Sequence, residues 1–270
     1  MQHAAALGGA FLLSWLLFFV VKWLTPTWDN TKRSRVPSML HSCAVVALAF
    51  HAAPRYFPDL LGARVSPLWS TGTRFEQTWQ MASVGYFVFD LHLMLAHADV
   101  FEWTYVAHHV TVIASVVFGV LHGGAAMNCL FMLHELSVPF TNIHFLLPRD
   151  SPWKPLNGVA VSESRRRAAR LPACPAAKPL RTLSPSSAPF QQLALAFFFG
   201  RLAIVAMAFR AVLIGQLADT WGRIPRTFCL HMVLMVALGA LDVLWFFLIL
   251  RMLGKSLRLK RGGGSHLKSP

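Results

Sequence analysis

Charged residues are scarce in this sequence. They make up 13% of the 270 residues, while apolar residues make up 55%. An ordinary soluble domain carries about 25% charged residues, so this composition predicts an integral membrane protein. Among the charged residues, acidic ones are the less frequent, with 11 Asp and Glu against 25 Lys and Arg. The basic residues gather in short segments between apolar runs and not on a polar domain, which argues against nucleic acid as a partner.

The sequence also lacks the spacings that metal and redox sites require. No two of its four cysteines lie close together, which excludes zinc and dithiol motifs. The histidine boxes of membrane di-iron enzymes are also missing: the chain has one adjacent histidine pair, His108-His109, and Tyr105 stands where an HxxHH box would need histidine. We therefore expect neither a metal nor a bound cofactor.

Long apolar runs are what the chain has in abundance. A bilayer-spanning helix needs roughly 20 mostly apolar residues. Seven runs approach this length: Ala5–Leu24, Pro37–Ala53, Trp79–His97, Tyr105–Leu121, Ala125–Leu147, Gln192–Ala218 and Phe228–Leu250. The first lacks a basic leader and a small-residue cleavage site, so we interpret it as a retained anchor. The pattern predicts an all-α integral membrane protein with a bundle of about seven transmembrane helices.

Basic residues between the runs predict the orientation of this bundle. They concentrate at positions 22–35, 149–181 and 251–268, which lie on one side of a seven-helix bundle. The positive-inside rule makes that side cytosolic, with the N-terminus lumenal and the C-terminus cytosolic. The loop 98–104, on the same side, carries Asp99 and Glu102, but acidic residues contribute little to the rule.

One segment interrupts this pattern. Residues 159–189 are rich in Arg, Ala, Ser and Pro and show no apolar periodicity, which is typical of a disordered loop. There are two alternatives to a disordered loop. The basic part of the segment could contact anionic lipid, or the segment could be a translated intron. We expect an N-terminal anchor helix at 1–32, a membrane domain at 33–254 interrupted by 159–189, and a basic cytosolic tail at 255–270.

Ionisable residues within the apolar runs are the candidate functional residues, because they are costly to hold at membrane depth. His108 and His109 could act as base or nucleophile, although adjacent helical residues point about 100° apart. Either Asp90 or Glu135 could orient the imidazole. His92 lies near Asp90 in the sequence, and we expect it to face the same internal cavity.

Three further residues are candidates for binding a substrate: His134, Asn142 and Arg201. Arg201 lies about ten residues into the sixth run, where it would hold a lipid headgroup or pair with a carboxylate. Asp242, Asp90 and Glu135 are the possible partners, and the sequence leaves the choice open.

The segment from Gly85 to Leu147 resembles the TLC-domain family of multi-pass endoplasmic-reticulum membrane proteins. The matching elements are a Y-x-x-x-D motif at Tyr86 and Asp90, the pair His108-His109, and an E-x-S-x-P-F-x-N stretch at 135–142. The family includes ceramide synthases, translocon-associated membrane proteins and small TLC domain-containing proteins. The resemblance extends over roughly 33–254.

Two departures separate the chain from the ceramide synthases. Their signature has HH-x-x-T, whereas Thr111 falls one place early, and their HD-x-x-D becomes His134-Glu135 with Val138 at the second acidic position. The chain is most similar to the small TLC domain-containing group, for which the resemblance implies a role in membrane lipid homeostasis.

Two functions follow as hypotheses. The first is an acyltransferase in which the histidine pair uses fatty acyl-CoA for ceramide-synthase-like N-acyl transfer, making sphingolipid or phospholipid products. The second is a non-catalytic lipid-binding or regulatory protein of the same membrane. Expected partners are membrane lipids, fatty acyl-CoA and a second copy of the chain in a homodimer.

Overall fold

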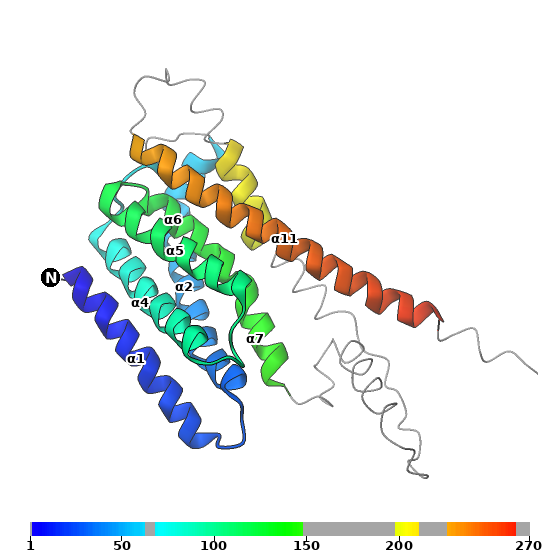
Figure 1. The fold of residues 1–270 in the computed structure, drawn as a ribbon. Coiled ribbons are helices and arrows are strands. Elements are labelled where there is room, and N and C mark those ends of the chain that lie inside the picture. Colours follow the sequence, from blue (N-terminus) through cyan, green and yellow to red (C-terminus); the bar gives the residue numbers. More distant parts are fainter. Residues whose placement is uncertain (1, 63–67, 148–197, 211–225, 263–270) are drawn as a thin grey trace, which may run out of the picture.

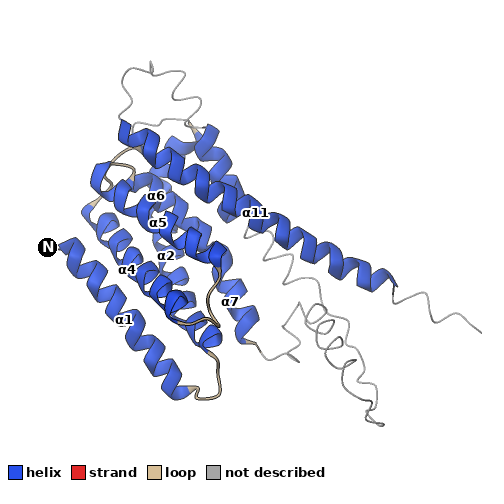
Figure 2. Cartoon of the chain, in the orientation of Figure 1, coloured by secondary structure: helices blue, strands red, loops and turns tan. Residues whose placement is uncertain are grey.

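The computed structural model describes residues 2–62, 68–147, 198–210 and 226–262, and their regular structure is entirely helical (Figure 2). The elements are α1 (Gln2–Leu24), α2 (Asn30–Leu61), α4 (Arg74–Ala96), α5 (Trp103–His122), α6 (Ala125–Phe131), η1 (Met132–Ser137), α7 (Val138–Leu146), η2 (Phe198–Ala203) and α11 (Arg226–Gly262). Residues 204–210 continue η2 as α-helix. The predicted insertion 159–189 and both ends of the sixth apolar run lie outside the described residues.

The helices form a bundle in which α1, α4 and α5 lie side by side (Figure 1). Helix α2 packs against α6, η1 and α7, and α11 crosses the bundle against α5 and η2. One buried apolar cluster joins α2, α6 and α11 through Tyr56, Leu130 and Met235. A second joins α1 to α4 through Phe18 and Phe89. Helix α2 thus covers η1, and α11 covers α5.

Four of the described helices are long and apolar enough to cross a membrane: Gln2–Leu24, Asn30–Leu61, Trp103–His122 and the α11 segment Leu230–Phe247. Their outer faces carry exposed large apolar side chains such as Leu16, Trp23 and Phe247. Such a surface suits hydrocarbon better than water, because contiguous exposed apolar area is rare on soluble monomers. The described fold is therefore that of an all-helical membrane protein.

Helix α2 is longer than the sequence predicted. We expected a short helix at 37–53, but α2 extends from Asn30 to Leu61 and contains Pro54 and Pro58. Its start is fixed by Asp29, whose carboxylate accepts a hydrogen bond from the Lys32 amide at 2.8 Å. Its last turns persist because tertiary burial outweighs the proline penalty: Leu60 is completely buried.

The fifth predicted run is also not one continuous α-helix. It divides into α6, the 3₁₀ helix η1 and α7, and η1 contains both His134 and Glu135. Pro139 explains the break, because it has no N–H to donate to the Glu135 carbonyl and its ring clashes with that group. The Val138 amide bonds to the Glu135 carbonyl instead. The tightened turn sets the directions in which the two ionisable side chains leave the backbone.

Helices α1 and α4 approach each other closely at Gly85. A Cβ added there would overlap the Leu7 carbonyl oxygen and lie 3.1 Å from the Ala10 Cβ. Both obstacles are parts of α1 that a side-chain rotation cannot remove. Small residues allow such close backbone contact between membrane helices.

We expect Gly85→Ala to separate α1 from α4 and to destabilise the protein by about 1–3 kcal/mol, as overpacking commonly does. Thermal unfolding of the purified protein measures the loss. Gly8→Ala on the same helix pair is the control, because nothing lies within 4 Å of its added Cβ. Equal melting temperatures for the Gly85 variant and the wild type would contradict the close approach.

Candidate functional site

Both ring nitrogens of His109, the second histidine of the pair, contact an oxygen atom of the protein. His109 Nδ1 lies 2.7 Å from the Tyr105 carbonyl oxygen, and His109 Nε2 lies 2.8 Å from Oδ2 of Asp90 on α4. A carbonyl oxygen only accepts, so Nδ1 carries a proton. The contact between Nε2 and Oδ2 holds a second proton, whether it belongs to the imidazole or to the carboxyl. His109 therefore has no lone pair left for a substrate.

The first histidine is placed differently. His108 is equally buried, yet its Nδ1 makes no hydrogen bond to any described residue. The preceding turn does not satisfy this nitrogen, in contrast to His109 Nδ1. The His108 ring packs against Trp245 of α11, with the ring centroids 5.0 Å apart. Of the two imidazoles, His108 is the one with an unsatisfied nitrogen.

The His109–Asp90 contact also determines where His108 points. Adjacent residues on a helix are separated by about 100°, so a contact that fixes His109 toward α4 fixes the rotation of α5. His108 is then directed toward α11. The sequence left open whether Asp90 or Glu135 would orient an imidazole; the structure gives this contact to Asp90, and Asp90 reaches His108 only through His109.

A second group of ionisable residues is buried at the junction of η1, η2 and α11. Asp242 accepts a hydrogen bond from Arg201 Nη1 at 2.7 Å through Oδ1, and its Oδ2 lies 3.0 Å from His134 Nδ1. All three side chains are more than nine-tenths buried. The Arg201 guanidinium also lies over the Trp245 ring, 5.2 Å from its centroid. Of the three carboxylates left open by the sequence, Asp242 is the one that pairs with Arg201.

One ring nitrogen of His134 in this group lies beside a carboxylate, and the other has no partner among the described residues. Its Nδ1 faces a carboxylate, which accepts hydrogen bonds, so Nδ1 carries a proton. Its Nε2 is buried and has no hydrogen-bond partner among the residues that the structure describes. A neutral His134 therefore presents a lone pair at Nε2.

A cavity of about 50 Å³ connects the two histidine sites. Its polar lining includes His108, His134, Glu135, Ser115 and Asn128, and the Ser115 hydroxyl is also buried without a partner in the described ranges. The remaining walls are mostly apolar: Val45, Phe87, Val112, Val116, Phe131, Met132, Met235 and Leu238. The space admits a few water molecules or one small group, which need about 10–15 Å³ per water.

Two predicted residues lie elsewhere. Asn142 is completely buried between α7 and α2, where its amide donates to the Ser38 hydroxyl at 3.0 Å and its oxygen lies 3.5 Å from Arg35 Nη1. It does not line the cavity. His92 is exposed on α4 and packs edge-on against Trp15. The expectation that His92 faces the internal cavity is wrong: it lies two residues, about 200° around the helix, from Asp90.

Three residues of this site were not predicted from the sequence. Ser115 and Asn128 are polar residues inside apolar runs, which was the available signal. Trp245, which contacts both His108 and Arg201, stands three residues after Asp242 and so shares its face of α11. Within the described ranges, no three His, Cys, Asp or Glu side chains form a group that could hold a metal.

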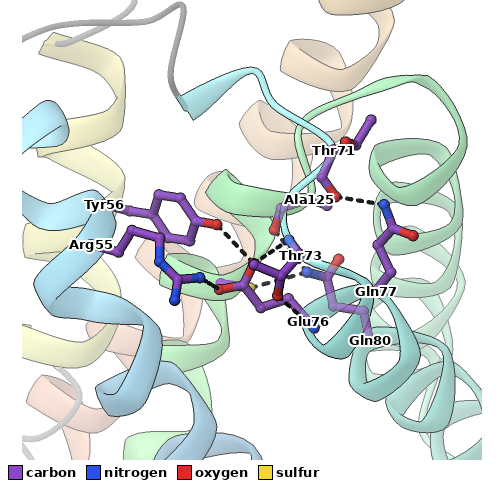
Figure 3. A network of polar contacts seen from close by, with 9 residues as sticks. Arg55, Tyr56, Thr71, Thr73, Glu76, Gln77, Gln80 and Ala125 are labelled. Carbon is purple, nitrogen blue, oxygen red and sulfur yellow. Dashed lines mark hydrogen bonds and ion pairs between the residues drawn. The ribbon is translucent and has the colours of Figure 1, made fainter.

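A separate polar network lies near the start of α4 (Figure 3). The Glu76 carboxylate accepts hydrogen bonds from Arg55 Nη1 at 2.7 Å, the Tyr56 hydroxyl at 2.7 Å and the Thr73 amide at 2.6 Å. Thr73 and Glu76 form a capping box, which explains why α4 begins earlier than predicted. Glu76 lies 14 residues, about 21 Å, before Asp90 along the helix.

This network is structural. Both carboxylate oxygens of Glu76 have donors, and the next turn of α4 continues the contacts: Gln80 donates to the Ala125 carbonyl at 2.7 Å, and Asn128 donates to Gln80 at 3.3 Å. The contacts tie α2, α4 and α6 together at one end of the bundle. Three donors from this chain therefore already contact the Glu76 carboxylate.

Comparison with known proteins supports the class of protein that the fold defines, an all-helical membrane protein. Residues 31–154 match the family model of the TLC domain. Residues 31–154 are therefore a TLC domain, as the motifs at 85–147 predicted. No curated protein and no solved structure matches the chain. The matched range contains Asp90, His108, His109, His134 and Glu135 but ends before Arg201 and Asp242.

Proposed function

We propose that this protein is a membrane enzyme of lipid homeostasis that transfers an acyl group from fatty acyl-CoA to a lipid amine or hydroxyl. The observation that carries the proposal is the buried, unsatisfied Nδ1 of His108 beside a cavity that also contains Glu135. An imidazole nitrogen without a partner is the group that general-base or nucleophilic catalysis needs. The TLC-domain match supports a multi-pass membrane protein acting in lipid metabolism.

In the proposed reaction, His108 Nδ1 accepts the proton of the acceptor amine or hydroxyl as that heteroatom attacks the thioester carbonyl. The C–S bond then breaks, and His108 returns its proton to the sulfur, so that CoA leaves as the thiol. Covalent transfer through an acyl-imidazole at Nδ1 gives the same products in two steps. In both routes His109 and Asp90 act by position, because their contact holds α5 so that His108 faces the cavity.

The proposed location is the endoplasmic-reticulum membrane with seven transmembrane helices, a lumenal N-terminus and a cytosolic C-terminus. The basic segments support this orientation, and they would place the end of α5 that carries His108 toward the cytosolic supply of acyl-CoA. Basic residues on that side would also attract the phosphates of acyl-CoA. The subgroup we propose is the small TLC domain-containing proteins.

A non-catalytic lipid-binding role is the second candidate, and two observations favour it. The cavity of about 50 Å³ holds a small group but no acyl chain. The replacement of the second acidic position of the ceramide synthases by Val138 points the same way. In this case the polar cavity would recognise part of a headgroup, and lipid composition would change through partners.

Lipidomics of cells that lack the protein separates the two functions. The knockout is rescued either with the wild type or with the His108→Ala, His109→Ala double variant, with membrane levels of both proteins matched. For an enzyme, we expect the wild type to restore the lipid profile and the double variant to leave the knockout profile unchanged. Full rescue by the double variant would overturn the enzymatic function and support lipid binding.

A further inference from the structure

Two histidines line the cavity, and only one of them belongs to the adjacent pair that the motifs highlight. His108 comes from α5 and His134 from η1. Each is about 6% exposed, and each has one ring nitrogen without a partner among the described residues: Nδ1 of His108 and Nε2 of His134. A buried polar atom left without a hydrogen bond costs free energy, so two such atoms in one cavity indicate a site where a ligand or a water molecule can bind.

His134 is held in one state by residues that lie beyond the matched TLC region. Oδ2 of Asp242 lies 3.0 Å from His134 Nδ1, and Oδ1 accepts a hydrogen bond from Arg201. This arrangement fixes the proton on Nδ1 and leaves Nε2 as an acceptor. Met235 and Leu238, on the same helix as Asp242, form walls of the cavity. The site is therefore completed by η2 and α11.

We propose that the cavity binds one protic group, a hydroxyl or a primary amine attached to an apolar stem, through His134 Nε2 and His108 Nδ1, with Asp242 as the positioning residue of His134. The imidazole lone pair selects a ligand that donates, and the mostly apolar walls accept the carbon atoms next to it. Arg201 holds the Asp242 carboxylate in place through a hydrogen bond of 2.7 Å to Oδ1. The inference deepens the proposed function, on which it rests for the identity of the site.

The test measures binding and not turnover, so it can fail or succeed independently of acyl transfer. The full chain is reconstituted in lipid nanodiscs, and its melting temperature is recorded with 1-octanol, 1-octylamine or 1-methoxyoctane. The methyl ether has a similar apolar stem but no proton to donate. At about ten times the dissociation constant, we expect octanol, octylamine or both to raise the melting temperature by about 3 °C more than the ether does.

Two variants assign this preference to the proposed residues. His134→Asn keeps a donor at the position of Nδ1 for Asp242 and removes Nε2, so the preference for protic ligands should disappear while the fold remains. Asp242→Asn should reduce the preference at least threefold in apparent affinity, because His134 loses its fixed proton. Glu76→Gln is the control: it weakens a different arginine–carboxylate pair, in which Glu76 is buried and Arg55 is half-exposed, and should lower stability without changing the preference.

If only octanol raises the melting temperature, the site binds a hydroxyl. If only octylamine raises it, the site binds an amine, with Glu135 as the counter-charge. Equal stabilisation by the ether would overturn the proposal. An unchanged preference in His134→Asn would also overturn it, as would loss of the preference in Glu76→Gln, because the effect would then follow stability alone.

Discussion

Asp242→Ala should lower the free energy of unfolding by about 3–5 kcal/mol, one of the two largest effects that we expect from a single substitution. Asp242 is 99% buried and contacts both Arg201 and His134. Its removal leaves a buried guanidinium without its carboxylate, which is far more costly than losing the pair as a whole. The change should appear as a fall of roughly 10 °C in the melting temperature of the purified protein.

The double variant Asp242→Leu, Arg201→Met provides the matched comparison. Replacing a buried ion pair by apolar residues of similar volume is often neutral or stabilising, so the double variant should recover most of the loss. Asp99→Ala controls for removal of a carboxylate in general: Asp99 is exposed, and its substitution should change stability by less than about 0.5 kcal/mol. A single variant as stable as the wild type would contradict the buried cluster.

His108→Gln should reduce acyl transfer by about 100-fold or more and leave stability nearly unchanged. The glutamine amide approximates the position of Nε2 and deletes Nδ1, the nitrogen that lacks a partner. Loss of a general base typically costs 10²–10⁴ in rate. Turnover of radiolabelled acyl-CoA and the melting temperature, measured on the same preparation, give both quantities.

His109→Gln should show the opposite balance. Its amide can still donate to Asp90, but the contact from Nδ1 to the Tyr105 carbonyl is lost. We expect a fall in stability of about 1 kcal/mol, the usual contribution of one hydrogen bond, and a smaller loss of activity than in His108→Gln. Reversal of the two activities would show that His109, and not His108, performs the chemistry.

The sequence predicted much of the fold because membrane insertion imposes simple rules. Long apolar runs gave the positions of α1, α4 and α5 to within about five residues, and the start of α11, but α11 extends twelve residues beyond the predicted end at Leu250. The run at 37–53 was predicted too short because it was bounded by Pro37 and Pro54, whereas packing of Tyr56 and Leu60 carries α2 onward. Tertiary burial of this kind leaves no local signal in the sequence.

The candidate site was predicted in composition more than in arrangement. The position of ionisable residues inside the apolar runs was enough to choose the candidates: His108, His109, Asp90, His134, Glu135 and Arg201. It could not decide which residues pair, because a rotation of one helix by 100° exchanges one neighbour for another. The 3₁₀ turn at η1 illustrates the limit: it determines where His134 and Glu135 point, and it depends on Pro139 in a way that periodicity does not express.

The most direct test of the account is acyl transfer by the purified wild-type protein in nanodiscs, with radiolabelled fatty acyl-CoA and a panel of sphingoid bases and lysolipids. The account predicts a labelled lipid product whose formation falls at least 100-fold in His108→Gln, while the variant melts at the wild-type temperature. Product formed equally by the wild type and a well-folded His108→Gln variant, or no product from any acceptor, would contradict it.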